Sequence, residues 1–439
     1  MLQVRRLWIV TVALVVCGMT TLVSVPTVSA QSKYKTLYKF PSNHKGGYQP
    51  EGRVIFDRAG NLYGTTAAGG KVIPHCYQGC GTVFKLTPQS NGGWIKEVLY
   101  KFTGGQDGAS PGHDLIFDTA GNLYGIANFG GNVQQCGGYG CGVVFKLSPK
   151  ADGTWTESVL HTFSDGQDGG NPSSGVIFDQ NGNLYGTTED GINLSQCGGY
   201  GCGGVFKLTP QADGSWRESA VYNFTGGADG GTSLAGLIFD QAGNLYGTTI
   251  HGGNCCGVVF ELSPQADGSW TESVVYSFGG GLDGDIPSGS VIFDQVGNLY
   301  GTTIYGGLGG QNAGLVFELS PNRDATWTEN VLYDFKGAAD GANPFAGVVF
   351  DKAGNLFGTT QLGGNFKQCV SYGCGVVFKL SPNSKGGWTY TVVHSFYDHP
   401  GAQPVSSLTF DPAGNLYGTD AGWTSNNNNT FGSVFEITP

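Results

Sequence analysis

One nine-residue motif, Phe-Asp-x-x-Gly-Asn-Leu-Tyr-Gly, occurs seven times in this chain at intervals of 54 to 61 residues. The copies begin at Phe56, Phe117, Phe178, Phe239, Phe293, Phe350 and Phe410. Only one copy changes an aromatic residue, with Phe357 in the position of the tyrosine. A motif that returns with so regular a period indicates one structural unit that is repeated and stacked.

Each repeat contains four short runs of β-forming residues. In the unit that begins at Gly236, the runs are residues 237–240, 245–249, 257–263 and 270–278. They are rich in Val, Phe, Tyr and Thr and are bounded by Gly, Asn, Asp and Pro, which is typical of strands joined by tight turns. The 77 glycines of the 439 residues fall at fixed places in the repeat, where such turns need positive φ angles. No helical periodicity appears beyond the N-terminal segment.

Seven units of four antiparallel strands predict an all-β fold, a seven-bladed β-propeller that forms a single domain over residues 31–439. Residues 34–40 match the fourth strand of a unit, whereas the last unit stops after its third strand, at residues 433–438. The N-terminal strand should therefore complete the seventh blade and close the ring, which pairs edges that would otherwise stay open. An open solenoid is the alternative, and it would need capping units at both ends.

In such a blade the first strand lines a central channel and the fourth strand lies outermost. The loops between strands two and three then share one face with the loops that lead from strand four to the next blade. We call this the variable face, because both kinds of loop differ in length and composition from unit to unit. The opposite face carries the nearly identical Asp-x-x-Gly-Asn and Asp-Gly turns.

Residues 1–30 have the pattern of an export signal. Two arginines precede an apolar run at residues 7–16, and residues 28–30 (Val-Ser-Ala) form a small-residue cleavage site. We expect a mature chain from about Gln31 that is secreted to the periplasm or the cell exterior, with no further span of the membrane. The alternatives are an uncleaved anchor and lipoprotein processing at Cys17.

The charge of the chain argues against some partners. The formal net charge is −11, and loss of the two signal-peptide arginines makes it −13, with 20 basic residues against 33 acidic ones. Nucleic acid and anionic lipid both demand a basic face, so neither is expected as a partner. We expect a monomer whose partner is a carbohydrate or a protein.

Ten of the eleven cysteines fall in local pairs, all within loops between strands two and three. The pairs are Cys76/Cys80, Cys136/Cys141, Cys197/Cys202, Cys255/Cys256 and Cys369/Cys374. An even number of locally paired cysteines in an exported chain predicts disulfides. The adjacent pair Cys255 and Cys256 would form a vicinal disulfide or bond elsewhere. Metal binding and redox chemistry are the alternatives, although zinc needs four ligands within reach and each pair stands alone in its unit.

An acidic residue recurs in the loops that lead into the blades, where the sequence often reads Gly-Gly-x-Asp-Gly. The residues in register are Asp107, Asp168, Asp229, Asp283 and Asp340. Calcium is the one cofactor that this pattern suggests, but calcium takes six to eight oxygens and each loop offers a single carboxylate. Capping of its own turn by the aspartate is therefore the competing interpretation, and no cofactor is predicted.

Individual function is expected where one unit departs from the others, because the shared residues build the fold. At the start of the channel strand most units carry Gly, Ala or Ser, whereas the first has Glu51 and Arg53 and the second has His113 and Asp114. With Glu189, which follows the second strand of the third unit, these residues are the candidates for acid–base catalysis if the protein is an enzyme. Unselected surface variation is the alternative.

Further departures follow the second strands and would ring the mouth of the channel at the variable face. They are Phe129, Asp190, His251, Tyr305 and Trp423, the candidate ligand-binding residues. The tryptophans that open each fourth strand are interpreted differently, because six residues in register indicate packing between blades rather than six ligand sites. They are Trp94, Trp155, Trp216, Trp270, Trp327 and Trp388.

The units read Gly-x-x-Phe-Asp-x-x-Gly-Asn-Leu-Tyr-Gly-Thr-Thr followed by Gly-Val-Val-Phe-Lys-Leu, and they resemble the GloVer tandem repeat of exported bacterial proteins. The resemblance covers nearly all of the mature chain, and it implies no activity, so no functional residue carries over. Because the chain stops at Pro439 directly after a strand, free secretion is expected rather than surface attachment. Binding at the variable face is the predicted role. The alternative is an extracellular polysaccharide lyase or hydrolase, or a metal-assisted lactonase, at the channel mouth.

Overall fold

The computed structural model describes residues 32–439 apart from residues 42–44, 192–196, 308–311, 367–368, 370–371, 398–402, 423, 426–427 and 430. The predicted signal segment 1–30 and the candidate Trp423 therefore lie outside the described residues, and both stay predictions. In the part of the chain that is described, no helix has the length and apolar character needed to cross a membrane.

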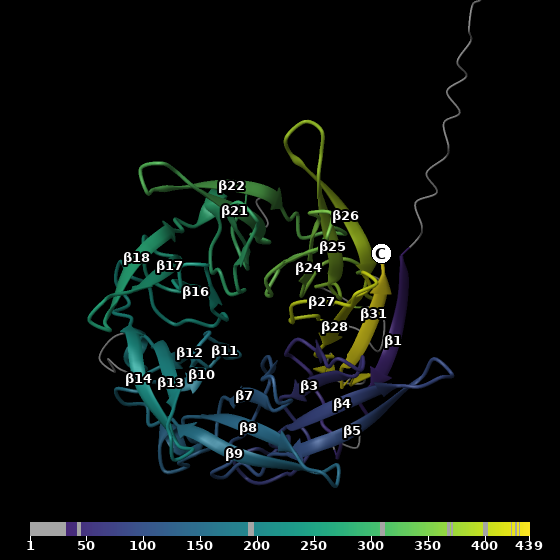
Figure 1. The fold of residues 1–439 in the computed structure, drawn as a ribbon. Coiled ribbons are helices and arrows are strands. Elements are labelled where there is room, and N and C mark those ends of the chain that lie inside the picture. The colour runs from purple at the N-terminus through teal and green to yellow at the C-terminus, as the bar shows by residue number, and fades with distance from the viewer. Residues whose placement is uncertain are drawn as a thin grey trace, which may run out of the picture. The chain divides into compact units, whose positions relative to one another are not determined.

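Seven antiparallel sheets, six of four strands and one of five, follow one another around a ring (Figure 1). Within each blade the strands pair in chain order, from a two-residue inner strand to a long outer strand. The predicted seven-bladed β-propeller is confirmed. Helical structure among the described residues is confined to three single-turn 3₁₀ segments, η1 (Cys136–Gly138), η2 (Cys197–Gly199) and η3 (Gly281–Asp283).

The strands of the blades have the following bounds. Blades one and two contain β2 (Ile55–Phe56), β3 (Leu62–Thr66), β4 (Thr82–Pro88) and β5 (Trp94–Lys101), then β6 (Ile116–Phe117), β7 (Leu123–Ala127), β8 (Val143–Pro149) and β9 (Trp155–Thr162). Blade three contains β11 (Ile177–Phe178), β12 (Leu184–Asp190), β13 (Gly204–Pro210) and β14 (Trp216–Asn223), with the extra strand β10 (Gly170–Pro172) paired to β12. Blades four and five contain β15 (Ile238–Phe239), β16 (Leu245–Thr249), β17 (Val258–Pro264) and β18 (Trp270–Ser277), then β19 (Ile292–Phe293), β20 (Leu299–Thr303), β21 (Leu315–Pro321) and β22 (Trp327–Asp334). Blade six contains β23 (Val349–Phe350), β24 (Leu356–Thr360), β25 (Val376–Pro382) and β26 (Trp388–Ser395).

The seventh blade is assembled from both ends of the chain. Its strands are β27 (Thr409–Phe410), β28 (Leu416–Asp420), β31 (Ser433–Thr438) and, outermost, the N-terminal strand β1 (Lys33–Lys39), while the small hairpin β29 (Thr424–Ser425) and β30 (Asn428–Asn429) lies between β28 and β31 in the sequence. In Figure 1 the purple β1 runs beside the yellow β31, and Lys33 pairs with Thr438. The Tyr34 ring stacks on His394 of blade six at a centroid distance of 4.1 Å. The predicted closure of the ring by β1 is thus confirmed.

The apolar core lies between the blades, with one cluster of buried side chains at each of the seven junctions. A phenylalanine of each third strand packs against a glycine of the second strand, as where a Cβ on Gly125 would lie 2.7 Å from the Phe145 ring. Tryptophans of the outer strands face tyrosines of the preceding blade, and Tyr63 and Trp155 have ring centroids 6.3 Å apart. This arrangement confirms their interpretation as packing residues, since aromatic pairs at this distance stabilise a core.

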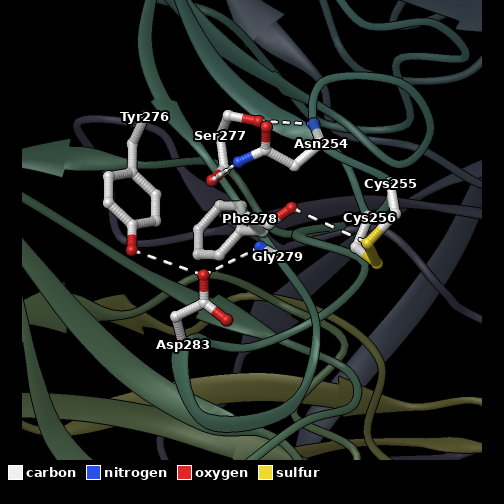
Figure 2. Close-up of a disulfide and its surroundings, with 8 residues drawn as sticks. All are labelled: Asn254, Cys255, Cys256, Tyr276, Ser277, Phe278, Gly279 and Asp283. Carbon is white, nitrogen blue, oxygen red and sulfur yellow. Dashed lines mark hydrogen bonds between the residues drawn. A yellow bond between two sulfur atoms is a disulfide. The ribbon is translucent and has the colours of Figure 1, made fainter.

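Five cysteine pairs lie at disulfide distance in the loops of the variable face. Four of them span four or five residues, with the second cysteine fully buried. In blade four the loop is shorter, and the pair is the vicinal Cys255–Cys256 (Figure 2). Cys255 Sγ lies 3.9 Å from the Phe278 carbonyl oxygen, and the Asn254 N–H donates to Ser277 Oγ at 2.7 Å. Each pair closes a short segment within the loop between strands two and three of its own blade.

Candidate functional site

A cavity of about 490 Å³ occupies the central channel and is lined by residues of all seven blades. Most of the lining comes from the segments that lead into the inner strands, where the side chains are small, as in Gly112, Ser174, Ala235, Gly289 and Ser406. Residues directly after the second strands add to the wall. Both sets of residues lie at the variable-face ends of their strands, so the cavity belongs to that face.

Glu51 projects into this cavity from the segment before β2. A Cβ on Gly112 of the next blade would lie only 3.0 Å from Glu51 Oε2, so a glycine there leaves room for the carboxyl group. The residue stays accessible to water within the cavity, but the channel wall surrounds it, and this desolvation raises the pKa of Glu51 to about 7. The carboxyl group is therefore partly protonated at neutral pH and can either donate or accept a hydrogen bond.

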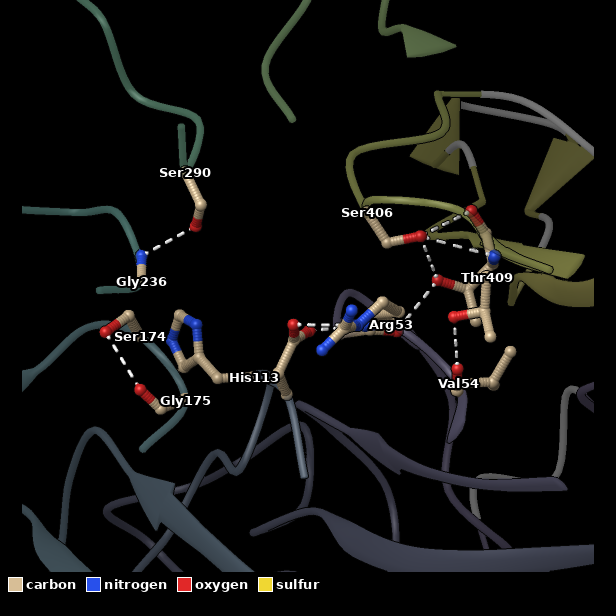
Figure 3. Close-up of polar contacts among 12 residues, drawn as sticks. Arg53, Val54, His113, Ser174, Gly175, Gly236, Ser290, Ser406 and Thr409 are labelled. Atoms are coloured by element: carbon tan, nitrogen blue, oxygen red, sulfur yellow. Dashed lines mark hydrogen bonds and ion pairs between the residues drawn. The ribbon is translucent and has the colours of Figure 1, made fainter. Parts of the chain in front are cut away.

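His113 lines the same cavity from blade two. Burial lowers the pKa of its imidazole, against the opposing effects of Asp114 and of a hydrogen bond to Asn128. Its backbone is anchored to blade one, because Thr65 Oγ1 donates to the His113 carbonyl oxygen at 2.8 Å. In Figure 3 the ring points away from Arg53 toward Ser174, in the segment between β10 and β11. The lowered pKa leaves a neutral imidazole on the channel wall at neutral pH.

Arg53 and Asp114 bind each other across the junction of blades one and two. The Arg53 backbone N–H donates to Asp114 Oδ1 at 2.7 Å, and Arg53 Nε lies 3.2 Å from Asp114 Oδ2. Their side chains are 39% and 37% exposed, so solvent screens the ion pair. The Arg53 and Asp114 side chains thus pair mainly with each other. Asp114 also contributes to the cavity wall.

Glu189 and Asp190 follow each other at the end of β12 but take different roles. Glu189 lines the cavity, and desolvation, with repulsion from Asp190 as a smaller cause, raises its pKa. Asp190 pairs with the backbone of Gly170 in β10 and accepts a hydrogen bond from Asn171 Nδ2 at 2.5 Å. Among these two neighbours, only Glu189 lines the cavity.

The remaining candidate ligand residues are divided by the structure. Phe129 is 40% exposed and lines the cavity. His251 and Tyr305 are exposed on the variable face, where each forms a β-bridge with the loop that leads into its own blade, to Gly231 and Asp285 respectively. Neither is among the residues that line the cavity. The structure therefore places Phe129 in the same cavity as Glu51, His113 and Glu189. It leaves His251 and Tyr305 outside that cavity.

Sequence reasoning missed three glutamines beside the cavity. Gln49, Gln361 and Gln403 line an adjoining hollow of about 300 Å³ together with Glu51. Gln361 occupies the register position of Glu189, directly after a second strand, and the other two precede the proline that opens the channel segment. A comparison of these two register positions across the seven repeats is the signal that would have identified the three glutamines.

The five aspartates considered for calcium are occupied by protein donors. Asp107 Oδ2, for example, accepts the Thr103 N–H at 2.8 Å and the Tyr100 hydroxyl at 3.0 Å. The same pattern, a backbone N–H four residues earlier and a side chain of the outer strand, recurs at Asp168, Asp229, Asp283 and Asp340. No group of three His, Cys, Asp or Glu side chains suited to a metal occurs in the described ranges. A calcium ion would have to share these carboxylates, and calcium stays an untested alternative to the expectation of no cofactor.

Fold and cavity together define a closed repeat propeller with a ligand-sized hollow at one end of its channel. The chain belongs to the Gloeobacter/Verrucomicrobia repeat family, whose model matches residues 7–192, 133–367 and 271–439. The three matches overlap, as expected for a repeat, and they confirm the resemblance found in the sequence.

Solved structures extend the comparison at the level of the fold. A fungal alcohol oxidase of the AA5 family, in complex with copper, has a TM-score of 0.53 and 15% identity, over 93% of this chain and 77% of that one. A putative gluconolactonase has 18% identity over 67% of this chain and 83% of its own, with a TM-score of 0.36. A putative oxidoreductase (glucose dehydrogenase) from Thermus thermophilus has 12% identity over 93% and 100%, with a TM-score of 0.39. A search of curated proteins finds no relative. These likenesses concern architecture and not activity.

Proposed function

We propose that this protein binds a neutral, polyhydroxylated ligand of carbohydrate type in the channel cavity, entering from the variable face. The observation that carries the proposal is a cavity of about 490 Å³ whose wall offers many hydrogen-bonding groups. Small-molecule pockets commonly measure ~300–1,000 Å³. The size therefore suits a ligand of one or a few sugar units.

The protonation of the wall favours a neutral ligand. The raised pKa values of Glu51 and Glu189 and the lowered pKa of His113 all move these groups toward their uncharged forms. Arg53 and Asp114 neutralise each other. The hydroxyl groups of a neutral ligand can both donate hydrogen bonds to and accept them from carboxyl and imidazole groups, so they can pair with this wall in either direction.

Two aromatic rings on the cavity wall support the same ligand class. Phe129 and Phe345 are 40% and 37% exposed and both line the cavity. The C–H faces of a sugar ring pack well on an exposed aromatic side chain, because both surfaces lose contact with water. Aromatic faces beside hydrogen-bonding groups are the combination that a sugar requires.

We also propose that the protein works outside the cytoplasm after removal of residues 1–30. The N-terminal signal pattern and the five cysteine pairs at disulfide distance support this, because disulfides persist in oxidising compartments. Mass analysis of the secreted protein, with and without reduction, tests the cleavage site and the pairing together.

The test of binding is thermal unfolding of the mature chain with a panel of plant and microbial glycans. A ligand that binds only the folded form raises the midpoint. Phe129→Ala and Gly112→Ala should abolish the shift, the second because its new Cβ would lie 3.0 Å from Glu51 Oε2. Val296→Ala, an exposed residue of an Asp-x-x-Gly-Asn turn on the opposite face, is the matched control. A shift that survives both cavity variants would place the ligand elsewhere.

An enzyme is the second candidate, favoured by the two carboxyl groups with raised pKa values that line one cavity, Glu51 and Glu189. A carboxyl group that titrates near neutral pH is suited to act as a general acid. Analysis of products after incubation with each bound glycan tests this. Cleavage that disappears in Glu51→Gln, with binding retained, would replace the binding role by catalysis.

A further inference from the structure

The channel cavity has a neighbour that shares part of its wall. This second cavity, of about 300 Å³, is lined by Gln49, Gln361 and Gln403 and by parts of blade seven. Glu51, Gln361 and Val405 line both cavities, so the two hollows meet at these three side chains. The second cavity adjoins the first over blades six, seven and one of the ring.

The three glutamine amides are held in place but have hydrogen-bonding capacity left over. Their backbones are bound, since the Gln361 N–H donates to the Asn343 carbonyl at 3.0 Å and the Gln403 N–H to the Cys374 carbonyl at 3.0 Å. The Gln49 carbonyl accepts the Ala67 N–H at 2.9 Å. Within the described residues no hydrogen bond engages the three side-chain amides, which are half-buried. Each amide offers two donors and an acceptor to a ligand.

The backbone at two of these positions is set by the repeat, because residues at the same register in other blades, such as Ser110 and Thr232, also have positive φ angles. Gln49 and Gln403 have positive φ angles of 57° and 61°, in the left-handed region that disfavours residues with a Cβ. Each is followed by a proline that starts the channel segment. The turn holds both residues at the inner rim of the ring, where Glu51 also stands.

We infer that the glutamine cavity is a second subsite, and that the ligand is an oligosaccharide of at least two units that crosses Glu51 from one cavity to the other. This inference rests on the proposed function and specifies its ligand. Neutral amides pair with sugar hydroxyls as both donors and acceptors. Apart from Glu51, none of the described residues that line this cavity carries a charge, and this favours a neutral ligand over an anion or a metal cation.

The test measures affinity against chain length by calorimetry, with the gluco-oligosaccharide series from glucose to the hexasaccharide in the cellobiose and the maltose linkage, and with the corresponding xylose series. If two subsites act together, at least one disaccharide binds about 10-fold or more tightly than its monosaccharide. Gln49→Asn, which shortens an amide that lines only the second cavity, should remove most of that gain and leave monosaccharide affinity within about 2-fold, because a lost neutral hydrogen bond costs about one factor of ten at most.

Two further variants keep the result interpretable. Gln403→Asn shortens the amide but retains a residue that tolerates positive φ, so folding should be preserved and the gain with length reduced. Gln167→Ala, an exposed glutamine in a variable-face loop outside both cavities, is the matched control and should bind like the parent. Thermal midpoints of all variants report whether each is folded.

The outcomes distinguish a failure of the second subsite from a failure of carbohydrate binding in the channel cavity. Equal affinity for monosaccharides and longer chains, or a length gain that persists in Gln49→Asn and Gln403→Asn, would overturn the second subsite while the channel site stands. No binding of any sugar in the three series would overturn the subsite. If the broader glycan panel also produced no thermal shift, the proposed carbohydrate binding would be contradicted as well.

Discussion

Arg53 and Asp114 occupy the same position in neighbouring blades, and the Asp114 carboxylate accepts the Arg53 backbone N–H at 2.7 Å while lying 3.2 Å from Arg53 Nε. An equivalent contact recurs between blades four and five, where the Gly236 N–H donates to Ser290 Oγ at 2.9 Å. The Arg53–Asp114 pair is therefore a charged version of a junction contact. Its neighbours Glu51 and His113, by contrast, keep their side chains on the cavity wall.

Replacing Asp114 by alanine should weaken this junction. The expected loss is about 1 kcal/mol of the free energy of unfolding, at the low end for a bond to a charged group, because both side chains are more than a third exposed. Asp114→Asn should lose less, since its Oδ1 can still accept the Arg53 N–H. Denaturant unfolding measures both. Full stability of the alanine variant combined with loss of ligand binding would show instead that Asp114 contacts the ligand.

The outer strands should make the stability of the fold decrease as the pH rises. Burial, with repulsion from Asp107, Asp229 and Asp283 respectively, raises the pKa values of Glu157, Glu272 and Glu329 to about 7. In the unfolded chain glutamate titrates near ~4.3, so between about pH 4.5 and pH 7 the folded protein holds protons that the unfolded chain has lost. The contribution of these three glutamates to the free energy of unfolding therefore falls across this window, while His113 and His394, whose pKa values are lowered, contribute in the opposite direction.

Thermal unfolding at pH 5 and pH 8 measures this effect. We expect a midpoint several degrees higher at pH 5. The triple variant with Glu157→Gln, Glu272→Gln and Glu329→Gln should show a much smaller difference between its midpoints at the two pH values. Its midpoint should rise relative to the parent at pH 8. An unchanged pH dependence in the triple variant would mean that other groups, such as Glu51, control it, and Glu51→Gln is the variant that separates them.

Removal of the N-terminal strand should open the ring. Deletion of residues 32–40 removes β1 and its pairing with β31, together with the stacking of Tyr34 on His394. The exposed edge of β31 then offers unpaired N–H and C=O groups to other chains. We expect a lower thermal midpoint and association into dimers or larger species, measured by size-exclusion chromatography with light scattering. A stable monomer would show that three strands suffice for the seventh blade.

The vicinal disulfide should be the first to react with a reductant. Cys255 is exposed, whereas Cys80, Cys141, Cys202 and Cys374, the second cysteines of the other pairs, are fully buried. Brief treatment with a mild phosphine followed by alkylation and peptide mass analysis should label Cys255 and Cys256 first. Equal labelling of all five pairs would contradict this order.

The same pairs should also differ in what they contribute to stability. Replacing Cys255 and Cys256 by serine should cost about 1 kcal/mol, against about 2 kcal/mol for the corresponding change at Cys197 and Cys202, because the closed loop is longer there. Denaturant unfolding of both double variants tests the ranking. A larger loss at the vicinal pair would show that Cys255 and Cys256 pack the loop against Phe278 rather than only close it.

Most of the fold was predictable because each repeat contains the residues that specify its own strands and turns. Asp240 accepts the Ala242 and Asn244 N–H groups at 2.8 Å, and Gly243 has a φ angle of +89°, so the Asp-x-x-Gly-Asn motif specifies a turn from local chemistry alone. The alternation of strands and turns, and the unmatched strands at the two ends, followed from the same periodicity. The extra strand β10 did not, since Gly170–Pro172 pairs with β12 only where the loop that leads into blade three bends back.

The candidate site was predicted in part from the sequence. There is a physical reason why some of its residues were found and others were missed. Departures from the repeat pointed to Glu51, His113 and Glu189, but they could not distinguish Glu189 from Asp190, one residue further along. Successive side chains of a strand face opposite sides, so that difference depends on the exact end of β12. Gln49, Gln361 and Gln403 lie more than 300 residues apart at the extremes, and only a comparison of their register positions across blades would have connected them.

The sequence by itself determined the number of blades, the turns, the packing aromatics and the cysteine pairs, because each of these depends on contacts within one repeat or between identical repeats. Only the tertiary structure decided which odd residues share a cavity, that Arg53 and Asp114 bind each other, and that the pKa of Glu51 rises to about 7. Those properties arise where seven blades converge on one axis. Proximity and desolvation there are set by ring closure, which no single repeat encodes.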